Sequence, residues 1–204
     1  VRLMLSTGLA GFEGRRRVRK VLTTDDQALP ADFVVVGVGI LPNMELAAAA
    51  GLDTADGIVV DDRCRTSDPD IYAIGDCTFH PNDIYGRRLR LESVHNALEQ
   101  AKTAASNICG VDSSYCQVPW FWSDQYDIKL QIAGLSEGYD DVVLRGDPSG
   151  GSFACFYLAD STLIAVDAIN SPREFMQSKR LIAERARPPV DALANPDIQI
   201  KDLG

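Results

Sequence analysis

A glycine followed at once by a carboxylate, Gly75-Asp76, ends a short apolar run in the stretch "PDIYAIGDCTFHP". Glycine at the end of a strand lets a ligand approach the backbone closely, because no Cβ stands in the way. An ionised aspartate only accepts hydrogen bonds and therefore suits ligand hydroxyls. Open α/β sheets bind ligands beyond the carboxyl ends of their strands. The pair predicts a ligand contact at the end of a buried strand, with a simple aspartate turn as the alternative.

A second glycine stretch, "GVGILPN" (37–43), follows the apolar run "FVVV" and precedes a short helical pattern. It imitates the dinucleotide fingerprint G-x-G-x-x-G, but Pro42 stands where the third glycine should let helix pack on strand. The partial match makes Gly39 a candidate contact to a cofactor. The alternative is that the stretch is a strand-to-helix crossover between domains. The "FVVV" run itself is typical of a strand buried on both faces.

Composition excludes several classes of function. The chain has 204 residues and a net charge of −9, which argues against nucleic acid because phosphate binding needs a basic footprint. No apolar run reaches membrane-spanning length. The five scattered cysteines form no CxxC pair and no metal-ligand spacing, so we expect reduced, mostly buried thiols in a cytoplasmic protein and no metal site.

The pattern of apolar residues predicts the elements that must position these groups. In the first half we expect strands at 1–6, 17–24, 33–37, 57–62 and 71–74, and a short helix ending at Gly51. The stretch "SVHNALEQAKTAASNICG" (93–110) predicts a helix that packs through one apolar stripe and ends at Gly110; the stripe is Val94, Leu98, Ala101, Ala105 and Ile108.

The second half of the chain has a different sequence pattern. Four strand-like runs, at 129–134, 141–146, 152–160 and 162–170, predict an antiparallel sheet. A helix then begins at Ser171-Pro172 and stops at Pro188-Pro189. We place a boundary between the two compartments near residues 110–118.

A cluster of basic residues lies between the two expected opening strands: Arg15, Arg16, Arg17, Arg19 and Lys20. A solvated hairpin is the simplest interpretation of this cluster. A role in gripping a cofactor phosphate is the alternative.

Four stretches together resemble a known family. "TSDPDIYAIGD" resembles the second flavin-binding motif of two-dinucleotide-domain flavoprotein reductases, and "VVVGVGILPN" resembles their crossover from the NAD domain back to the FAD domain. "ESVHNALEQA" and "PWFWSDQYDIKLQIAGLSEGYD" are similar to the FAD-dependent ferredoxin reductases of oxygenase systems, the putidaredoxin reductase-like family. The resemblance covers essentially the whole chain. It implies that this chain corresponds to the C-terminal half of such a reductase.

The resemblance implies roles for particular residues. Asp76 would hold the ribityl chain of FAD, and Glu92-Ser93-Val94 would place the Val94 amide at the pyrimidine edge of the flavin. A helix N-terminus there would stabilise the reduced flavin by about 0.3–1 kcal/mol, with Glu92 working against it. Trp122 would lie near the flavin ring, whereas Trp120 is expected in the core and His95 on the helix surface. No side chain is required as a catalytic acid, base or nucleophile.

The implied fold is α/β followed by α+β. Residues 1–38 would be the end of a Rossmann-like NAD(P)-binding domain, residues 39–114 part of the FAD-binding domain, and residues 115–204 a C-terminal antiparallel sheet with a helix. The two phosphate-binding glycine loops of the family are absent, so we expect a piece of a longer enzyme that binds FAD weakly or not at all by itself.

The implied function is electron transfer from NAD(P)H through FAD to a [2Fe–2S] ferredoxin that serves a mono- or dioxygenase. A rubredoxin reductase, or a non-enzymatic module that binds a ferredoxin or oligomerises, is the alternative. The resemblance also argues against disulfide reduction: the disulfide reductases of the superfamily carry a His-Glu pair in the C-terminal domain, whereas the only histidines here, His80 and His95, both precede that domain. For partner docking we favour the arginines of "YGRRLRLE" (85–92) over those of the late helix. The choice between NADH and NADPH and the oligomeric state stay open.

Overall fold

The computed structural model describes residues 1–203 and divides into two compact units, residues 1–41 and residues from 42 onward. The mixed sheets and their helices give an α/β fold. Each unit is described by itself.

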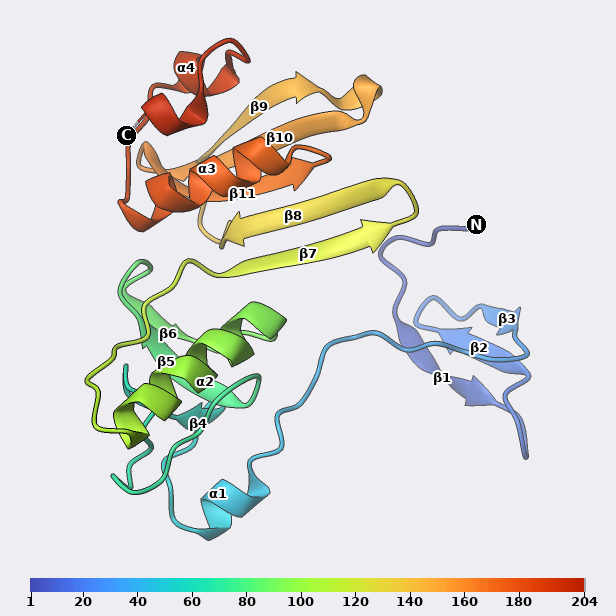
Figure 1. Cartoon of the computed structure of the whole chain (residues 1–204). Coiled ribbons are helices and arrows are strands. Elements are labelled where there is room, and N and C mark those ends of the chain that lie inside the picture. Colours follow the sequence, from blue (N-terminus) through green and yellow to red (C-terminus); the bar gives the residue numbers. More distant parts are fainter. Residues whose placement is uncertain (204) are drawn as a thin grey trace. The chain divides into compact units, whose positions relative to one another are not determined.

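The first unit is a three-stranded antiparallel sheet in the order β1-β2-β3 (Figure 1). Its strands are β1 (Leu9–Glu13), β2 (Lys20–Thr23) and β3 (Ala28–Pro30). The prediction of a strand at 1–6 is wrong, since pairing starts at Leu9. The prediction of a buried strand at 33–37 is also wrong, since this run is an exposed coil. A strand needs a neighbouring strand to hydrogen-bond its backbone N–H and C=O groups, and no described strand pairs with this run.

The second unit begins with α1 (Glu45–Ala49), which ends before Gly51 as predicted, since Gly51 has φ +78°. A small sheet follows, with β4 (Ile58–Val59) parallel to β5 (Thr78–Asn82) and β5 antiparallel to β6 (Arg87–Leu89). The prediction of a buried strand at 71–74 is wrong. Only the single bridge between Arg65 and Tyr72 pairs this run, Ile71 and Ile74 are exposed, and the paired strand starts after Gly75.

Helix α2 (Val94–Ile108) is present as predicted, but it is turned the other way. The apolar stripe expected in the core is largely exposed, with Val94 at 57%, Leu98 at 56% and Ile108 at 65% of their accessible surface. The face that packs inward is mostly polar: Asn96, Gln100, Thr103, Ala104 and Asn107. Hydrogen bonds to the neighbouring loops stabilise this arrangement, because a buried amide is costly only when it lacks partners.

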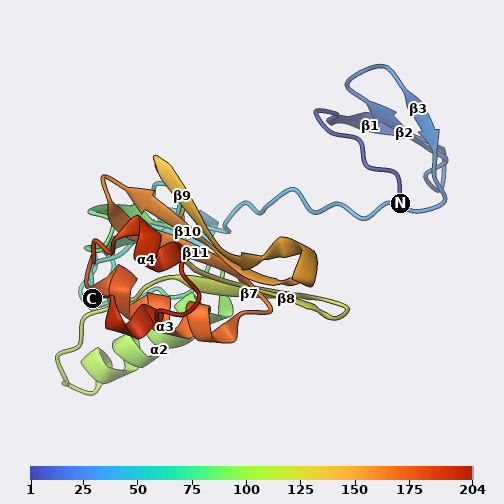
Figure 2. The same ribbon diagram turned by 90° about the horizontal axis from the view of Figure 1, so that it is seen from above.

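The C-terminal part is a five-stranded antiparallel sheet in the order β7-β8-β11-β10-β9, and all four predicted runs lie in it. Its strands are β7 (Trp120–Gln125), β8 (Ile128–Gly134), β9 (Asp141–Asp147), β10 (Ser152–Ala159) and β11 (Thr162–Ile169). Helix α3 (Pro172–Ala183) packs on β8 and β11, and α4 (Val190–Ala194) packs on β9 (Figures 1 and 2).

This sheet and its helices enclose the main hydrophobic core, which includes Phe156, Leu158, Leu181 and Ile182. Helix α3 ends at Ala183 and not at the predicted Pro188-Pro189, because Arg185 adopts a left-handed φ of +52°. Buried Arg145 ties the last segment to the sheet: it forms an ion pair with Glu174 at 3.4 Å and donates to four carbonyls of residues 193–198.

Candidate functional site

The Gly75-Asp76 turn lies directly against helix α2. Gly75 is buried with φ +84°, a conformation that favours glycine, and a Cβ there would lie 3.7 Å from the Ala97 Cβ. Its carbonyl accepts hydrogen bonds from the amide and the hydroxyl of Thr78, at 3.1 and 2.8 Å. Asp76 is exposed, and its carboxylate has no hydrogen-bond or ion-pair partner within residues 1–203. The backbone is therefore fixed while the carboxylate is free for a ligand.

Gln100, which the sequence analysis missed, holds this turn in place. Its Oε1 accepts from the Gly75 amide at 2.7 Å and lies 3.0 Å from the Thr78 hydroxyl. Its Nε2 lies 3.1 Å from Nδ1 of His80. Gln100 is completely buried, so these contacts are not weakened by water. Polar residues at helical spacing on α2 were the signal that could have revealed it.

His80 completes this network from strand β5. Since Gln100 Nε2 can only donate, His80 Nδ1 must be the acceptor and Nε2 carries the proton. Nε2 has no partner in the described chain, but the ring lies edge-on to Tyr115 with centroids 5.1 Å apart. Burial, followed by the charge of Arg88, lowers the pKa of His80 to about 4. The ring is therefore neutral near pH 7 and acts as an anchor for Gln100.

The N-terminus of α2 presents unpaired backbone donors. Ser93 caps the helix by accepting from the Asn96 amide at 3.1 Å. The amides of Val94 and His95 have no acceptor within residues 1–203. The expectation that Glu92 opposes this positive end needs correction, because Arg90 forms an ion pair with it at 2.5 Å. Arg90 also pairs with Asp56 at 3.3 Å, so its single positive charge is shared and offsets part of the Glu92 charge.

A hollow of about 160 Å³ adjoins this helix end. It is lined by residues before and at the start of α2 and by the β7–β8 hairpin: Leu91, Glu92, Ser93, Pro119, Trp120, Phe121, Ile132, Gly134 and Leu135. The wall is mostly apolar and aromatic, and its residue Ser93 directly precedes the free amides of Val94 and His95 in the chain. Such a hollow suits a flat ring with one polar edge.

Aromatic rings continue from this hollow along β7. The Trp120 ring lies 5.4 Å from that of Trp122, 5.4 Å from His95 and 5.7 Å from Phe175, measured between centroids. Trp120 packs against the main core, as predicted. His95 is not a free surface residue as expected: it is half-buried on Trp120, and desolvation with nearby Lys179 lowers its pKa.

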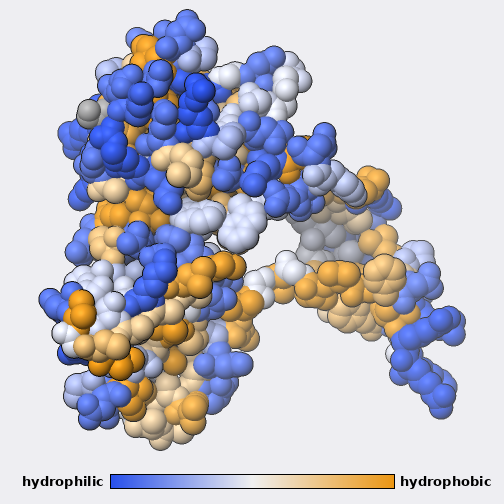
Figure 3. Space-filling view, in the orientation of Figure 1, coloured by the Kyte–Doolittle hydropathy of each residue, from blue (hydrophilic) through white to orange (hydrophobic). Residues whose placement is uncertain are grey.

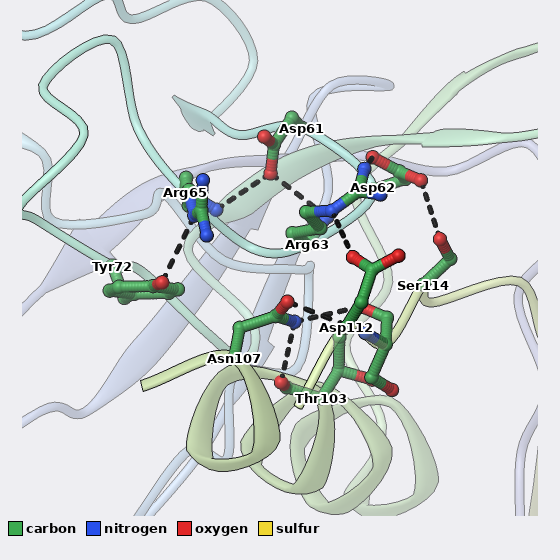
Figure 4. A network of polar contacts seen from close by, with 10 residues as sticks. Asp61, Asp62, Arg63, Arg65, Tyr72, Thr103, Asn107, Asp112 and Ser114 are labelled. Carbon is green, nitrogen blue, oxygen red and sulfur yellow. Dashed lines mark hydrogen bonds and ion pairs between the residues drawn. The ribbon is translucent and has the colours of Figure 1, made fainter. Parts of the chain in front are cut away.

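A second polar network fixes the loop ahead of the Gly75-Asp76 turn to the other end of α2 (Figure 4). The Asp61 carboxylate accepts from the amides of Arg63 and Arg65, at 2.9 and 2.8 Å. Arg63 pairs with Asp62 and Asp112, at 3.1 and 2.7 Å. Because these charged groups are bound by backbone amides, a tyrosine hydroxyl or opposite charges, we interpret this network as a support for the loop.

Two further predicted site residues lie outside this network. Gly39 lies in an exposed coil of the first unit with φ +93°, and a Cβ added there would meet no atom within 4 Å. Trp122 is half-buried and stacks on Trp120. The prediction of buried thiols holds for Cys64 but is wrong for Cys109 and Cys116, which are exposed.

Residues 1–203 contain no group of three or more His, Cys, Asp or Glu suited to a metal ion. None of their helices has the length and apolar character needed to cross a bilayer.

Comparisons with known proteins cover almost all of the chain. Residues 1–101 match the family model described as pyridine nucleotide-disulphide oxidoreductase, and residues 120–204 match the one described as reductase C-terminal. The chain is 43% identical to putidaredoxin reductase CamA of Pseudomonas putida, over all of this chain and 49% of that protein. It is 44% identical to the probable ferredoxin reductase CtmF of Castellaniella defragrans, over all of this chain and 50% of that protein.

A solved structure agrees with these relatives. The reductase in the covalent putidaredoxin reductase–putidaredoxin complex superimposes with a TM-score of 0.90 at 44% identity, over 97% of this chain and 48% of that chain. The chain thus spans about half the length of the curated relatives it matches.

Proposed function

The chain belongs to the pyridine nucleotide-disulphide oxidoreductase family, in the group with the ferredoxin reductases, and from that premise we propose that it is the C-terminal part of an FAD-containing, NAD(P)H-dependent ferredoxin reductase. Its electron acceptor in this proposal is a [2Fe–2S] ferredoxin that serves a mono- or dioxygenase. Residues 1–38 would end the NAD(P)-binding domain, residues 39–114 would belong to the FAD-binding domain, and residues 115–204 would form the C-terminal domain.

The observation that carries the proposal is the way Gln100 holds the Gly75-Asp76 turn against α2. This contact brings a free carboxylate and a helix with free amides at its start into one rigid part of the chain. The residues present fit FAD: Asp76 can accept from ribityl hydroxyls, and the Val94 and His95 amides can donate to the polar edge of the ring. When bound, FAD would take a hydride from NAD(P)H and pass single electrons on to the iron–sulfur protein.

The chain's own residues would bind and orient the cofactor. The positive end of α2 favours negative charge on the ring edge by about 0.3–1 kcal/mol, and the Arg90–Glu92 pair keeps the Glu92 carboxylate from cancelling that effect. The aromatic wall of Trp120 and Phe121 would exclude water from one side of the ring. We also propose a cytoplasmic location, because all five cysteines are free in the structure and unpaired thiols are typical of a reducing compartment.

The test is a visible absorption spectrum. The purified chain with FAD alone should stay colourless, because the phosphate-binding loops are absent. Adding the N-terminal half of putidaredoxin reductase with FAD should produce a bound-flavin band that NADH bleaches, and Asp76→Asn should weaken FAD retention. A mixture that retains no flavin under any of these conditions would overturn the proposal.

The alternative acceptor, rubredoxin, has one observation in its favour. The rubredoxin-NAD(+) reductase of Pseudomonas putida is 38% identical over 83% of this chain. Reduction of a [2Fe–2S] ferredoxin and of a rubredoxin by the same flavin-loaded mixture distinguishes the two, and we expect the ferredoxin to be reduced faster.

A further inference from the structure

Helix α2 buries its polar side and exposes its apolar side. Val94, Leu98 and Ile108 are all more than half exposed, and apolar side chains gather on the surface over the helix (Figure 3). The inward side carries amides and hydroxyls, and Gln100 among them is completely buried. Exposing the aliphatic side chains forgoes hydrophobic stabilisation, so the buried amides must make specific contacts in return. What Gln100 requires of its partners therefore decides how this part of the chain is held.

The contacts of Gln100 are possible in only one orientation of its side-chain amide. The Gly75 backbone amide always donates, so the Gln100 atom 2.7 Å from it must be the carbonyl oxygen Oε1. The amide nitrogen Nε2 is then the atom that lies 3.1 Å from Nδ1 of His80. Because Nε2 only donates, this contact needs a free lone pair on Nδ1. With a proton on Nδ1 two donors would face each other, and turning the amide over would only move the conflict to Gly75.

The surroundings of His80 keep Nδ1 unprotonated. The ring is buried, and burial followed by the charge of Arg88 lowers its pKa to about 4. Arg88, on the adjacent strand β6, donates to two backbone carbonyls at 2.7 and 2.9 Å and so stays charged beside the ring. Tyr115 lies edge-on to the ring from the segment after α2, and burial raises its pKa, so it brings no negative charge. Neither group would stabilise an imidazolium ion.

His80 acts on the Gly75-Asp76 turn through Gln100 and not directly. Only 1% of its surface is exposed, so the ring itself is not available to a ligand. The Gln100 carbonyl that binds the Gly75 amide also lies 3.0 Å from the Thr78 hydroxyl. One side chain thus contacts the residues on both sides of Asp76 in the chain. The position of the Asp76 carboxylate therefore depends on a relay from the His80 ring through the Gln100 amide to the Gly75 backbone.

We propose that His80 is a positioning residue for the flavin-binding turn, and that it holds the turn only while its Nδ1 accepts the hydrogen bond from Gln100. This inference rests on the proposed function, in which Asp76 holds the ribityl chain of FAD. Protonation of Nδ1 removes the last acceptor of the relay and frees the Gln100 amide to leave Gly75. Retention of FAD should therefore weaken in acid.

The experiment compares the wild type with His80→Asn and His80→Leu. Asn and Leu have nearly the same shape and leave a similar gap in place of the ring, but only Asn offers a carbonyl oxygen that can accept from Gln100 and does not titrate. The first readout is hydrogen exchange of the Gly75 amide at pH 7, measured by NMR on the ¹⁵N-labelled complete chain without FAD. The Gly110 amide, at the other end of α2, is the internal control. Circular dichroism checks that both variants fold.

In His80→Leu the Gly75 amide should exchange on the order of tenfold faster than in the wild type, because Gln100 loses a buried partner and its fixed orientation. In His80→Asn it should exchange like the wild type, and the Gly110 amide should exchange alike in all three proteins. Unchanged exchange of Gly75 in His80→Leu would overturn the proposal. So would equally fast exchange in both variants, since the ring would then act only by filling space.

The second readout is FAD retention in the mixture with the N-terminal half of putidaredoxin reductase, followed by equilibrium dialysis from pH 7 to pH 4. At pH 7 His80→Leu should bind FAD on the order of tenfold more weakly than the wild type, and His80→Asn should match the wild type. At about pH 4 half of the wild-type His80 rings carry the second proton, so the wild-type affinity should be about half that of His80→Asn. Parallel pH profiles of these two proteins would overturn the role of Nδ1 in acid.

The two readouts separate the positioning role from the proposed function. If none of the three proteins retains FAD, the reductase function fails, while the exchange of the Gly75 amide still decides whether His80 holds the turn. If FAD is retained and His80→Leu equals the wild type in both readouts, only the positioning role of His80 fails.

Discussion

Replacing Gln100 by Leu should destabilise the chain by removing the contact between α2 and the Gly75-Asp76 turn. Leu has nearly the same volume, so the main loss is polar. The Gly75 amide and His80 Nδ1 lose their partners, while the Thr78 hydroxyl keeps the Gly75 carbonyl at 2.8 Å. Two buried groups left unpaired cost about 2–3 kcal/mol in the free energy of unfolding.

The assay is urea unfolding followed by circular dichroism, with Leu98→Gln as the matched control. Leu98 lies on the same helix but is 56% exposed, so the reverse exchange should change stability by less than about 0.5 kcal/mol. A Gln100→Leu variant that is as stable as the control would refute the reasoning. It would mean that the turn is held by packing alone.

Three further predictions concern charge. Burial depresses the pKa of His80 to about 4, below its ordinary 6.5, so stability is full above the unfolded pKa and is lost as the pH falls toward 4. Urea unfolding should show a loss of about 1–2 kcal/mol between about pH 7 and pH 5, and an equally steep profile in His80→Gln would contradict this cause. Arg145→Met should cost about 3–5 kcal/mol in the same assay because it leaves Glu174 and several carbonyls unpaired, whereas exposed Arg180→Met should cost under about 1 kcal/mol. Asp76→Asn should change the free energy of unfolding by less than about 0.5 kcal/mol, since the Asp76 carboxylate has no partner in the described chain. Equilibrium dialysis should nevertheless show weaker FAD retention in the assembled mixture. If the variant without FAD is destabilised, Asp76 has a structural role and the prediction is wrong.

The sequence was sufficient for elements whose residues pair locally. Strands β8 to β11 of the C-terminal sheet follow from apolar runs separated by turn residues, whereas β7 was not predicted. Helix α2 follows from its helical spacing and Gly110. Each of these depends on contacts within about twenty residues of chain, which the pattern records directly.

Most failures concern contacts that are distant in the chain: which face of an element is covered, and whether a run finds a strand to pair with. Apolar periodicity predicted that Leu98 would be buried, but the inward face of α2 carries Gln100, whose partners Gly75 and His80 come from distant loops and strands. The runs at 33–37 and 71–74 are apolar enough for buried strands, but no described strand flanks either one. Polar satisfaction and strand pairing are long-range properties, so a local pattern cannot supply them.

The most direct test of the proposed flavin site is an NMR measurement on the ¹⁵N-labelled chain assembled with the N-terminal half of putidaredoxin reductase, with and without FAD. The account predicts that FAD shifts the amide signals of Val94, His95 and Asp76, while that of Gly110 at the far end of α2 stays in place. If FAD binds the mixture and the amides at the start of α2 do not respond, the flavin lies elsewhere and the account is wrong.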